Sequence, residues 1–172
     1  MQIKHLPGRS QTKGREKMLS KPKYGWTDFQ LEGTSSYSLS YLDDIPLEWL
    51  DEAICGLKQM RPFCVKGFLE PRRFLCLVSY WNCHILVEED GREPLGEGDI
   101  TSECSHTSML TFCRLLHRDI SSHIDEWADF ECRADEDDGC LEKKKLLTKK
   151  LKVLEKLIEE REDSFGENRC FL

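Results

Sequence analysis

The sequence lacks the motifs of nucleotide-using enzymes and of structural zinc proteins. It contains neither a P-loop nor a G-x-G-x-x-G run, so nucleotide-dependent chemistry is not expected. It also contains no C-x-x-C pair, although a structural zinc site usually requires two such close pairs. No run of 18 apolar residues occurs, and the N-terminus has no apolar signal segment. We therefore expect neither a membrane-spanning helix nor secretory export, which favours a cytoplasmic location.

Cysteine, in contrast, is abundant, with nine residues in 172. Without an export signal, we expect reduced thiols, several of them buried as small hydrophobic side chains. Cys170 stands one residue too close to the C-terminus for a prenylation box, so lipidation is not expected.

The candidate catalytic and metal-binding pairs are few. Cys104 with His106 and Cys113 with His117 are the closest potential zinc pairs, but Cys113 belongs to an apolar helical stripe. Cys83 and His84 are neighbours on an expected strand, so their side chains point to opposite faces and cannot activate one another directly. We therefore predict no catalytic residue, no metal site and no cofactor. A small zinc or thiol enzyme is the less favoured alternative.

Charge is distributed unevenly along the chain. Residues 1–23 hold seven Lys and Arg against one acid, whereas the whole chain has a net charge of −7. The rest of the chain is therefore acidic. An acidic body argues against a nucleic-acid surface on the folded domain and fits a basic protein partner.

The most hydrophobic stretch, residues 63–90, predicts three antiparallel strands in a meander. Glu70-Pro71-Arg72 and Tyr80-Trp81-Asn82 supply the expected turns. Residues 24–41 contain two further strand-like runs, of which 37–41 alternates cleanly between apolar and polar residues. The fold class is therefore α+β, with an antiparallel sheet of four or five strands packed against two amphipathic helices and a further C-terminal helix.

Three helices are expected. Asp43-Asp44-Ile45-Pro46 opens the first, which should end near Met60 before Pro62. The second is expected at about residues 107–128, after a loop over 91–105. The third, 141–163, has a basic first half and an acidic second half. Its apolar seam either docks on its own domain or makes a homodimer. The seam consists of Leu147, Leu151, Leu154 and Ile158.

These elements define the expected domain organisation. Residues 1–23 form a disordered basic leader, with Met18 as an alternative start, and residues 24–130 form the α+β domain. An acidic linker (131–140), the C-terminal helix (141–163) and a tail (164–172) follow.

One family resemblance follows from this order of elements. Ser40-Tyr41-Leu42-Asp43-Asp44-Ile45-Pro46 leads into a helix, a strand hairpin follows over 74–87, and a helix ends with Ile124-Asp125-Glu126-Trp127. Over about residues 36–130 the chain resembles small acidic bacterial α+β proteins of the immunity type, which neutralise toxins in the cytoplasm. The resemblance implies a non-catalytic inhibitor that binds a basic toxin domain.

The leading functional hypothesis is thus a non-enzymatic protein-binding module with an acidic contact surface. The alternative is an adaptor or regulator that self-associates through the C-terminal helix. The acids expected to contact a partner are Glu88, Glu89, Asp90, Asp125, Glu126 and Asp129.

Overall fold

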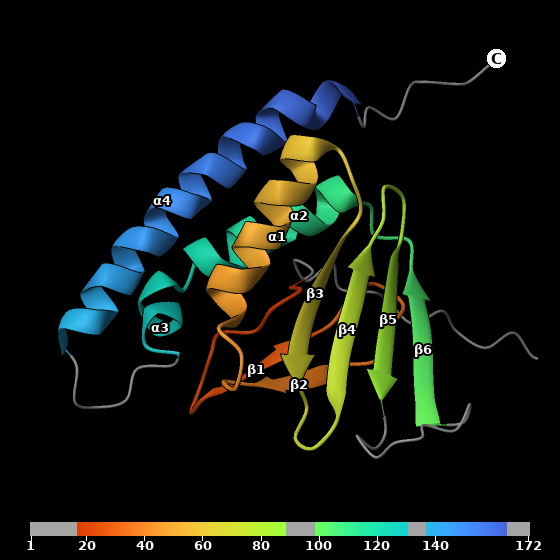
Figure 1. Cartoon of the computed structure of the whole chain (residues 1–172), viewed down its shortest axis with the longest axis horizontal. Coiled ribbons are helices and arrows are strands. Elements are labelled where there is room, and N and C mark those ends of the chain that lie inside the picture. The colour runs from red at the N-terminus through yellow and green to blue at the C-terminus, as the bar shows by residue number, and fades with distance from the viewer. Residues whose placement is uncertain (1–16, 89–98, 131–136, 165–172) are drawn as a thin grey trace, which may run out of the picture.

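The computed structural model describes residues 17–88, 99–130 and 137–164. They form a mixed α+β fold, as the sequence predicts, with two antiparallel sheets (Figure 1). The smaller sheet pairs β1 (Trp26–Phe29) with β2 (Tyr37–Ser40). The larger sheet has the order β3-β4-β5-β6, and its strands are β3 (Phe63–Phe68), β4 (Arg73–Val78), β5 (Cys83–Glu88) and β6 (Ile100–Ser105).

The central meander is confirmed, since β3, β4 and β5 pair in sequence order through the two predicted turns. Strand β6 was expected to belong to a loop. Its sequence, ITSECS, has a single strongly apolar residue, which hides the alternation that marks a strand. β6 lies at the edge of the sheet and needs few apolar side chains, so its pairing with β5 depends on the backbone ladder.

Helix α1 (Ile45–Gln59) confirms the first predicted helix. Asp44 is its N-cap, and its side chain accepts a hydrogen bond from the Leu47 N–H. Met60 ends the helix in the left-handed conformation. The apolar side of α1 buries Trp49, Leu50 and Leu57, and the Trp49 indole donates to the Lys66 carbonyl across 2.7 Å. Helix α1 is thereby fixed beside β3, which leaves its acidic side in solvent.

The prediction of a single helix over 107–128 is wrong, because two helices occupy this range. Helix α2 (Met109–Ser121) has Ser122 as its C-cap, and α3 (Ile124–Ala128) follows after His123, whose backbone is not helical. The Ser121 and Ser122 hydroxyls both donate to the Arg118 carbonyl. Hydroxyls that compete for the last carbonyls of a helix favour its termination.

Helix α4 (Asp137–Arg161) is followed by a short 3-10 turn, η2 (Glu162–Ser164). It lies across α1, α2 and α3 and contacts all three (Figure 1). It starts within the expected linker, so 137–140 belong to the helix, while 131–136 lie outside the described residues. The apolar seam is buried in this chain's own core, with residues 0–7% exposed. The seam therefore docks on its own domain, which is one of the two alternatives, and Leu147, Leu151, Leu154 and Ile158 have almost no surface left for contact with a second chain.

The charge asymmetry of α4 follows from this docking. Lys143 lies 3.2 Å from Asp44, Lys150 pairs with Asp51 of α1, and Lys144 pairs with Asp125 of α3. The basic half of α4 thus faces acids of the helices beneath it. These ion pairs set the register of a helix whose apolar seam spans only a few turns.

The boundary of the expected leader also needs correction. Met18 and Leu19 are 1% exposed, and both donate their backbone N–H to Asp119 Oδ2, at 2.8 and 2.9 Å. Leu19 forms a bridge with Phe29, so this segment runs beside β1. The folded part of the chain therefore includes residues 17–23, and residues 1–16 lie outside the described part.

The cysteines divide into two groups. Among the described residues, six cysteines have free thiols, as expected, and Cys76, Cys83 and Cys113 among them are fully buried. Cys140, at the start of α4, is disulfide-bonded, which corrects the expectation of reduced thiols at this position.

Candidate functional site

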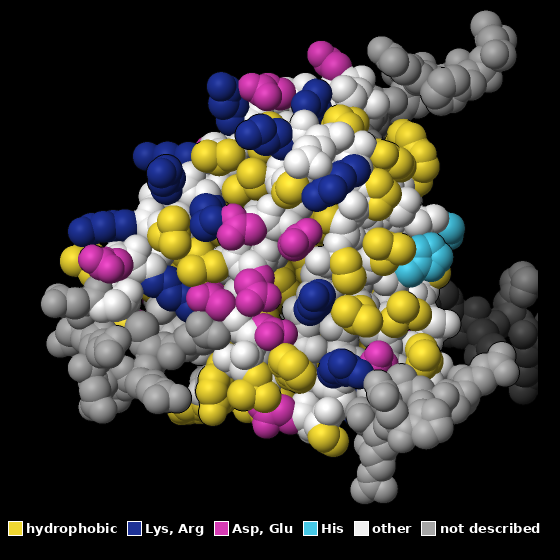
Figure 2. Space-filling model, viewed as in Figure 1, with side chains coloured by type: hydrophobic (Ala, Val, Ile, Leu, Met, Phe, Trp, Pro, Cys, Tyr) yellow, Lys and Arg dark blue, Asp and Glu magenta, His cyan; other side chains and the backbone are white. Residues whose placement is uncertain are grey.

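The outer face of the four-stranded sheet exposes apolar side chains. Leu77 on β4 is 44% exposed, Leu86 on β5 is 37% exposed and Ile100 on β6 is 45% exposed. Leu75 lies directly opposite Leu86, and Leu77 lies opposite His84. Trp81, in the turn before β5, is 61% exposed. In Figure 2 apolar side chains are spread over these strands, interrupted by a few charges. We call Leu75, Leu77, Leu86 and Ile100 the outer apolar patch.

This patch departs from the usual alternation of buried apolar and exposed polar residues in a sheet with one solvent-exposed face. The β4 run FLCLV is apolar throughout, but only Phe74, Cys76 and Val78 are fully buried. The outward-facing positions of a strand that meets solvent are normally polar. Exposed apolar side chains that adjoin each other mark contact sites more often than isolated ones do.

Beside the patch, α1 presents unpaired acids. Asp43, Glu48 and Glu52 lie along its solvent side and the segment before it, and within the described ranges none of the three forms a salt bridge. Glu48 and Glu52 line a hollow of about 280 Å³ with Asp51, between α1 and β3. The hollow's other walls are Trp49, Cys64, Val65 and Lys66. We call Asp43, Glu48 and Glu52 the α1 acids.

The α1 acids are close enough to perturb one another. Burial raises the pKa of the Glu48 carboxyl, and the charges of Asp43, Asp44 and Glu52 raise it further. Burial also raises the pKa of Asp43, which nearby Lys66 partly offsets. Asp44 and Asp51, by contrast, are paired with lysines of α4. The unpaired acids thus face away from α4, toward β3 and the sheet.

The acids predicted from the sequence do not come together. Glu88 ends β5, where its Oε2 lies 2.5 Å from Arg73 Nε, whereas Asp125, Glu126 and Asp129 belong to α3 and its C-cap on the other side of α1 (Figure 1). Asp125 pairs with Lys144, and Asp129 is exposed. Glu89 and Asp90 lie outside the described residues.

Glu126 is held by a basic residue of its own chain. It lies 2.5 Å from Lys21, and the hydrogen bond with Lys21 lowers the pKa of its carboxyl. Glu88, Asp125 and Glu126 are thus each neutralised within the chain, so the predicted acidic patch does not form from the residues that the structure describes.

Sequence reasoning missed the α1 acids because Asp43 and Asp44 were interpreted only as a helix start. The signal was available. Asp44, Glu48 and Asp51 are spaced by four and three residues, and Glu52 lies four after Glu48, which places them on the polar side of an amphipathic helix. Which of them stay unpaired depends on the lysines of α4, about 100 positions along the chain.

The fully buried thiols of the described residues are not placed for nucleophilic chemistry. Cys83 is buried and His84 is exposed, so they point to opposite faces as predicted. Burial raises the pKa of the Cys113 thiol, and that of Cys76 is raised first by its hydrogen bond with Cys83. Raised pKa values keep these thiols protonated and poorly nucleophilic. In the described ranges, no group of three or more His, Cys, Asp or Glu is placed to hold a metal ion.

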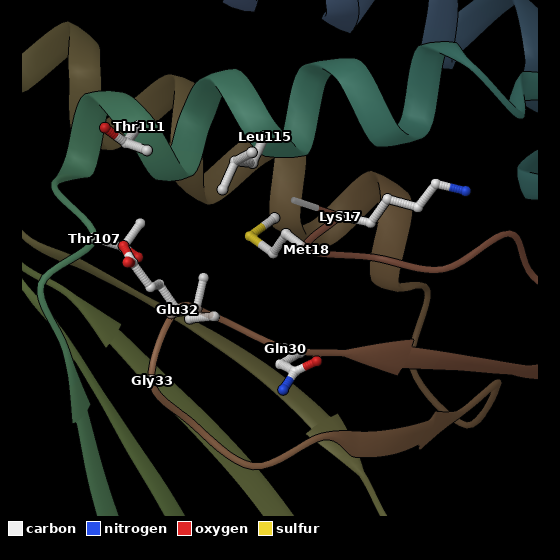
Figure 3. Close-up of a pocket in the computed structure, with 9 residues that line it drawn as sticks. Lys17, Met18, Gln30, Glu32, Gly33, Thr107, Thr111 and Leu115 are labelled. Atoms are coloured by element: carbon white, nitrogen blue, oxygen red, sulfur yellow. The ribbon is translucent and has the colours of Figure 1, made fainter. Parts of the chain in front are cut away.

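A second hollow, of about 210 Å³, lies between the N-terminal segment, the β1–β2 turn and the start of α2 (Figure 3). Lys17, Gln30, Glu32, Thr107 and Thr111 supply its polar atoms. The Lys17 side chain extends away from Thr107 and Glu32, and Thr107 Oγ1 already bonds Ser105 Oγ at 2.9 Å. The arrangement brings no nucleophile and base together.

Comparisons with protein-family models, with curated proteins and with solved structures give no match for this chain. Among the described residues, no helix has the length and apolar character needed to cross a bilayer.

Proposed function

We propose that this protein is a non-enzymatic protein-binding module, and that the α1 acids contact a basic partner. The observation that carries the proposal is the closeness of Asp43, Glu48 and Glu52, which form no salt bridge with any residue that the structure describes. Glu48 and Glu52 line one hollow, and the charges of Asp43 and Glu52 add to the burial that raises the pKa of Glu48. Such an arrangement costs folding energy, and a cation from a partner would relieve it. A toxin-neutralising inhibitor of the immunity type, acting in the cytoplasm, is the finer form of the proposal.

Four observations bear on the finer form. The acidic body and the order of helix, hairpin and helix support it, as do six free thiols. The disulfide at Cys140 argues against a cytoplasmic location, because structural disulfides are rare there. The self-associating adaptor loses its basis, since the α4 seam is buried within one chain.

The test is a comparison of partner capture by three tagged full-length chains. One is wild type, one carries Glu48→Gln and Glu52→Gln, and the control carries Glu155→Gln and Glu159→Gln on the exposed side of α4. We expect a basic protein retained by wild type and control, released by added salt and lost from the Glu48/Glu52 variant. Equal capture by all three chains would exclude the α1 acids as a contact surface.

A further inference from the structure

The outer apolar patch adjoins the α1 acids along β3. Cys64 and Lys66 on the outer side of β3 line the acidic hollow, and the same two residues lie opposite Leu77 and Leu75 of β4. The acids and the leucines therefore belong to one continuous surface. Stable protein interfaces combine an apolar centre with a polar rim in this way.

We propose that the outer face of the β3–β6 sheet is the docking surface for a basic protein, whose apolar contact residues cover Leu77 and Leu86 while its Lys or Arg side chains reach the α1 acids. This inference rests on the proposed function and extends it from the acidic rim to the apolar centre. In this arrangement the apolar contacts with the sheet provide most of the affinity, and the charge contacts with α1 orient the partner.

Charge complementarity selects this occupant over a second copy of the chain. Among the described outward positions of these four strands, Lys66 and Arg73 are the only permanent cations, and Arg73 is paired with Glu88. A second copy docked face to face would bring a second set of α1 acids and almost no cations to meet them. A basic partner meets the acids with opposite charge, which also accelerates association.

The apolar centre has the composition of an interface core. Leu77 and Leu86 lie on adjacent strands at neighbouring register positions, and Trp81 stands at the end of the same strands. Aromatic and aliphatic anchors near the centre of a contact contribute most of its affinity. On β6, by contrast, the outward positions Ser102 and Cys104 are exposed but not strongly apolar, so the apolar centre lies on β4 and β5.

The experiment places a photo-crosslinking amino acid at Leu86 of the full chain and, as a matched control, at Val153, an exposed apolar position on α4. Crosslinking is carried out in cells of the source organism. The captured protein is identified by mass spectrometry, purified and titrated against four chains, which are wild type, Leu77→Lys, Glu48→Gln with Glu52→Gln, and Val153→Lys.

The proposal expects a Lys- and Arg-rich protein crosslinked at Leu86 and not at Val153. Its affinity should fall by about tenfold or more in Leu77→Lys, which adds a repelling cation and removes an apolar contact, and stay unchanged in Val153→Lys. Thermal unfolding of Leu77→Lys near the wild-type temperature shows that lost binding is not lost folding. Should that variant fail to fold, Leu77→Thr replaces it.

Four outcomes would overturn the inference. Equal crosslinking at Leu86 and Val153, or none at either, removes the docking surface. A dimer of the purified chain that dissociates in Leu77→Lys makes a second copy the occupant. Loss of affinity in the Glu48/Glu52 variant with none in Leu77→Lys leaves the proposed function standing and removes the sheet from it, whereas no loss in either variant removes both.

Discussion

The inner and outer faces of the β3–β6 sheet differ in what their apolar residues contact. On the inner face, Phe74 is fully buried and packs edge-on against Phe29 at 5.0 Å, with Trp49 stacked at 6.4 Å. On the outer face, Leu77, three residues along the same strand, is 44% exposed. Both are large apolar residues of one hydrophobic run, so composition does not distinguish the position that stabilises the fold from the position available to a partner.

The first prediction addresses the two faces directly. Phe74→Ala should lower the free energy of unfolding by about 3–5 kcal/mol, because it removes buried apolar surface and leaves a cavity among Phe29, Tyr37 and Trp49. Leu77→Ala should cost about 1 kcal/mol or less, since much of its side chain is already in water. Urea denaturation of both variants measures the difference. Similar costs would mean that the outer face is covered in the isolated chain.

The second prediction concerns the segment that precedes β1. Asp119 is 5% exposed, accepts the N–H groups of Met18 and Leu19 and is paired with Arg118. Asp119→Ala should therefore cost about 2–3 kcal/mol, because two buried N–H donors lose their acceptor. Amide hydrogen exchange should accelerate at Met18 and Leu19. Asp28→Ala, which removes an exposed carboxylate bonded to Ser38, is the control, and unchanged exchange in Asp119→Ala would contradict the prediction.

The third prediction, with the smallest effect, sharpens the contrast between stability and binding. The raised pKa of Glu48 means that folding favours its protonated form, so the ionised carboxylate destabilises the fold at neutral pH. Because Glu48 is exposed and solvent screens its charge, Glu48→Gln should stabilise the isolated protein by no more than about 0.5 kcal/mol near pH 7. The gain should vanish as the pH falls below the usual value of 4.5, where the carboxyl is protonated in both states.

Thermal unfolding from pH 4 to pH 7 measures this gain. Glu159→Gln, on the exposed side of α4, serves as the control and should change stability little at any pH. A Glu48→Gln variant that is less stable than wild type at pH 7 would show that the carboxylate stabilises the fold, and would remove the main support for a binding role.

Local sequence determined most of the individual elements. The alternation over 37–41, the proline turn at Glu70-Pro71-Arg72 and the cap at Asp44 each act through contacts within a few residues, and β2, the β3–β4 turn and α1 formed where these signals predict. Strand β6 and the break between α2 and α3 were missed. Strand β6 depends on its pairing with β5. The break between α2 and α3 depends on serine hydroxyls that bond a backbone carbonyl only once the helix exists.

The candidate site depended on the tertiary structure instead. The sequence places acids along α1, but lysines of α4 neutralise Asp44 and Asp51, whereas Asp43, Glu48 and Glu52 form no salt bridge with the residues that the structure describes. It also contains a uniformly apolar β4, but which of its residues meet solvent is set by α1 and the β1–β2 sheet, whose aromatic rings pack against Phe74 on one face. The periodicity of apolar residues and helix capping are local properties of a chain. The exposure of a side chain and its pairing with an opposite charge depend on segments far apart in sequence. The sequence by itself therefore determined the α+β class, and only the packing of the elements decided which residues remain available to bind.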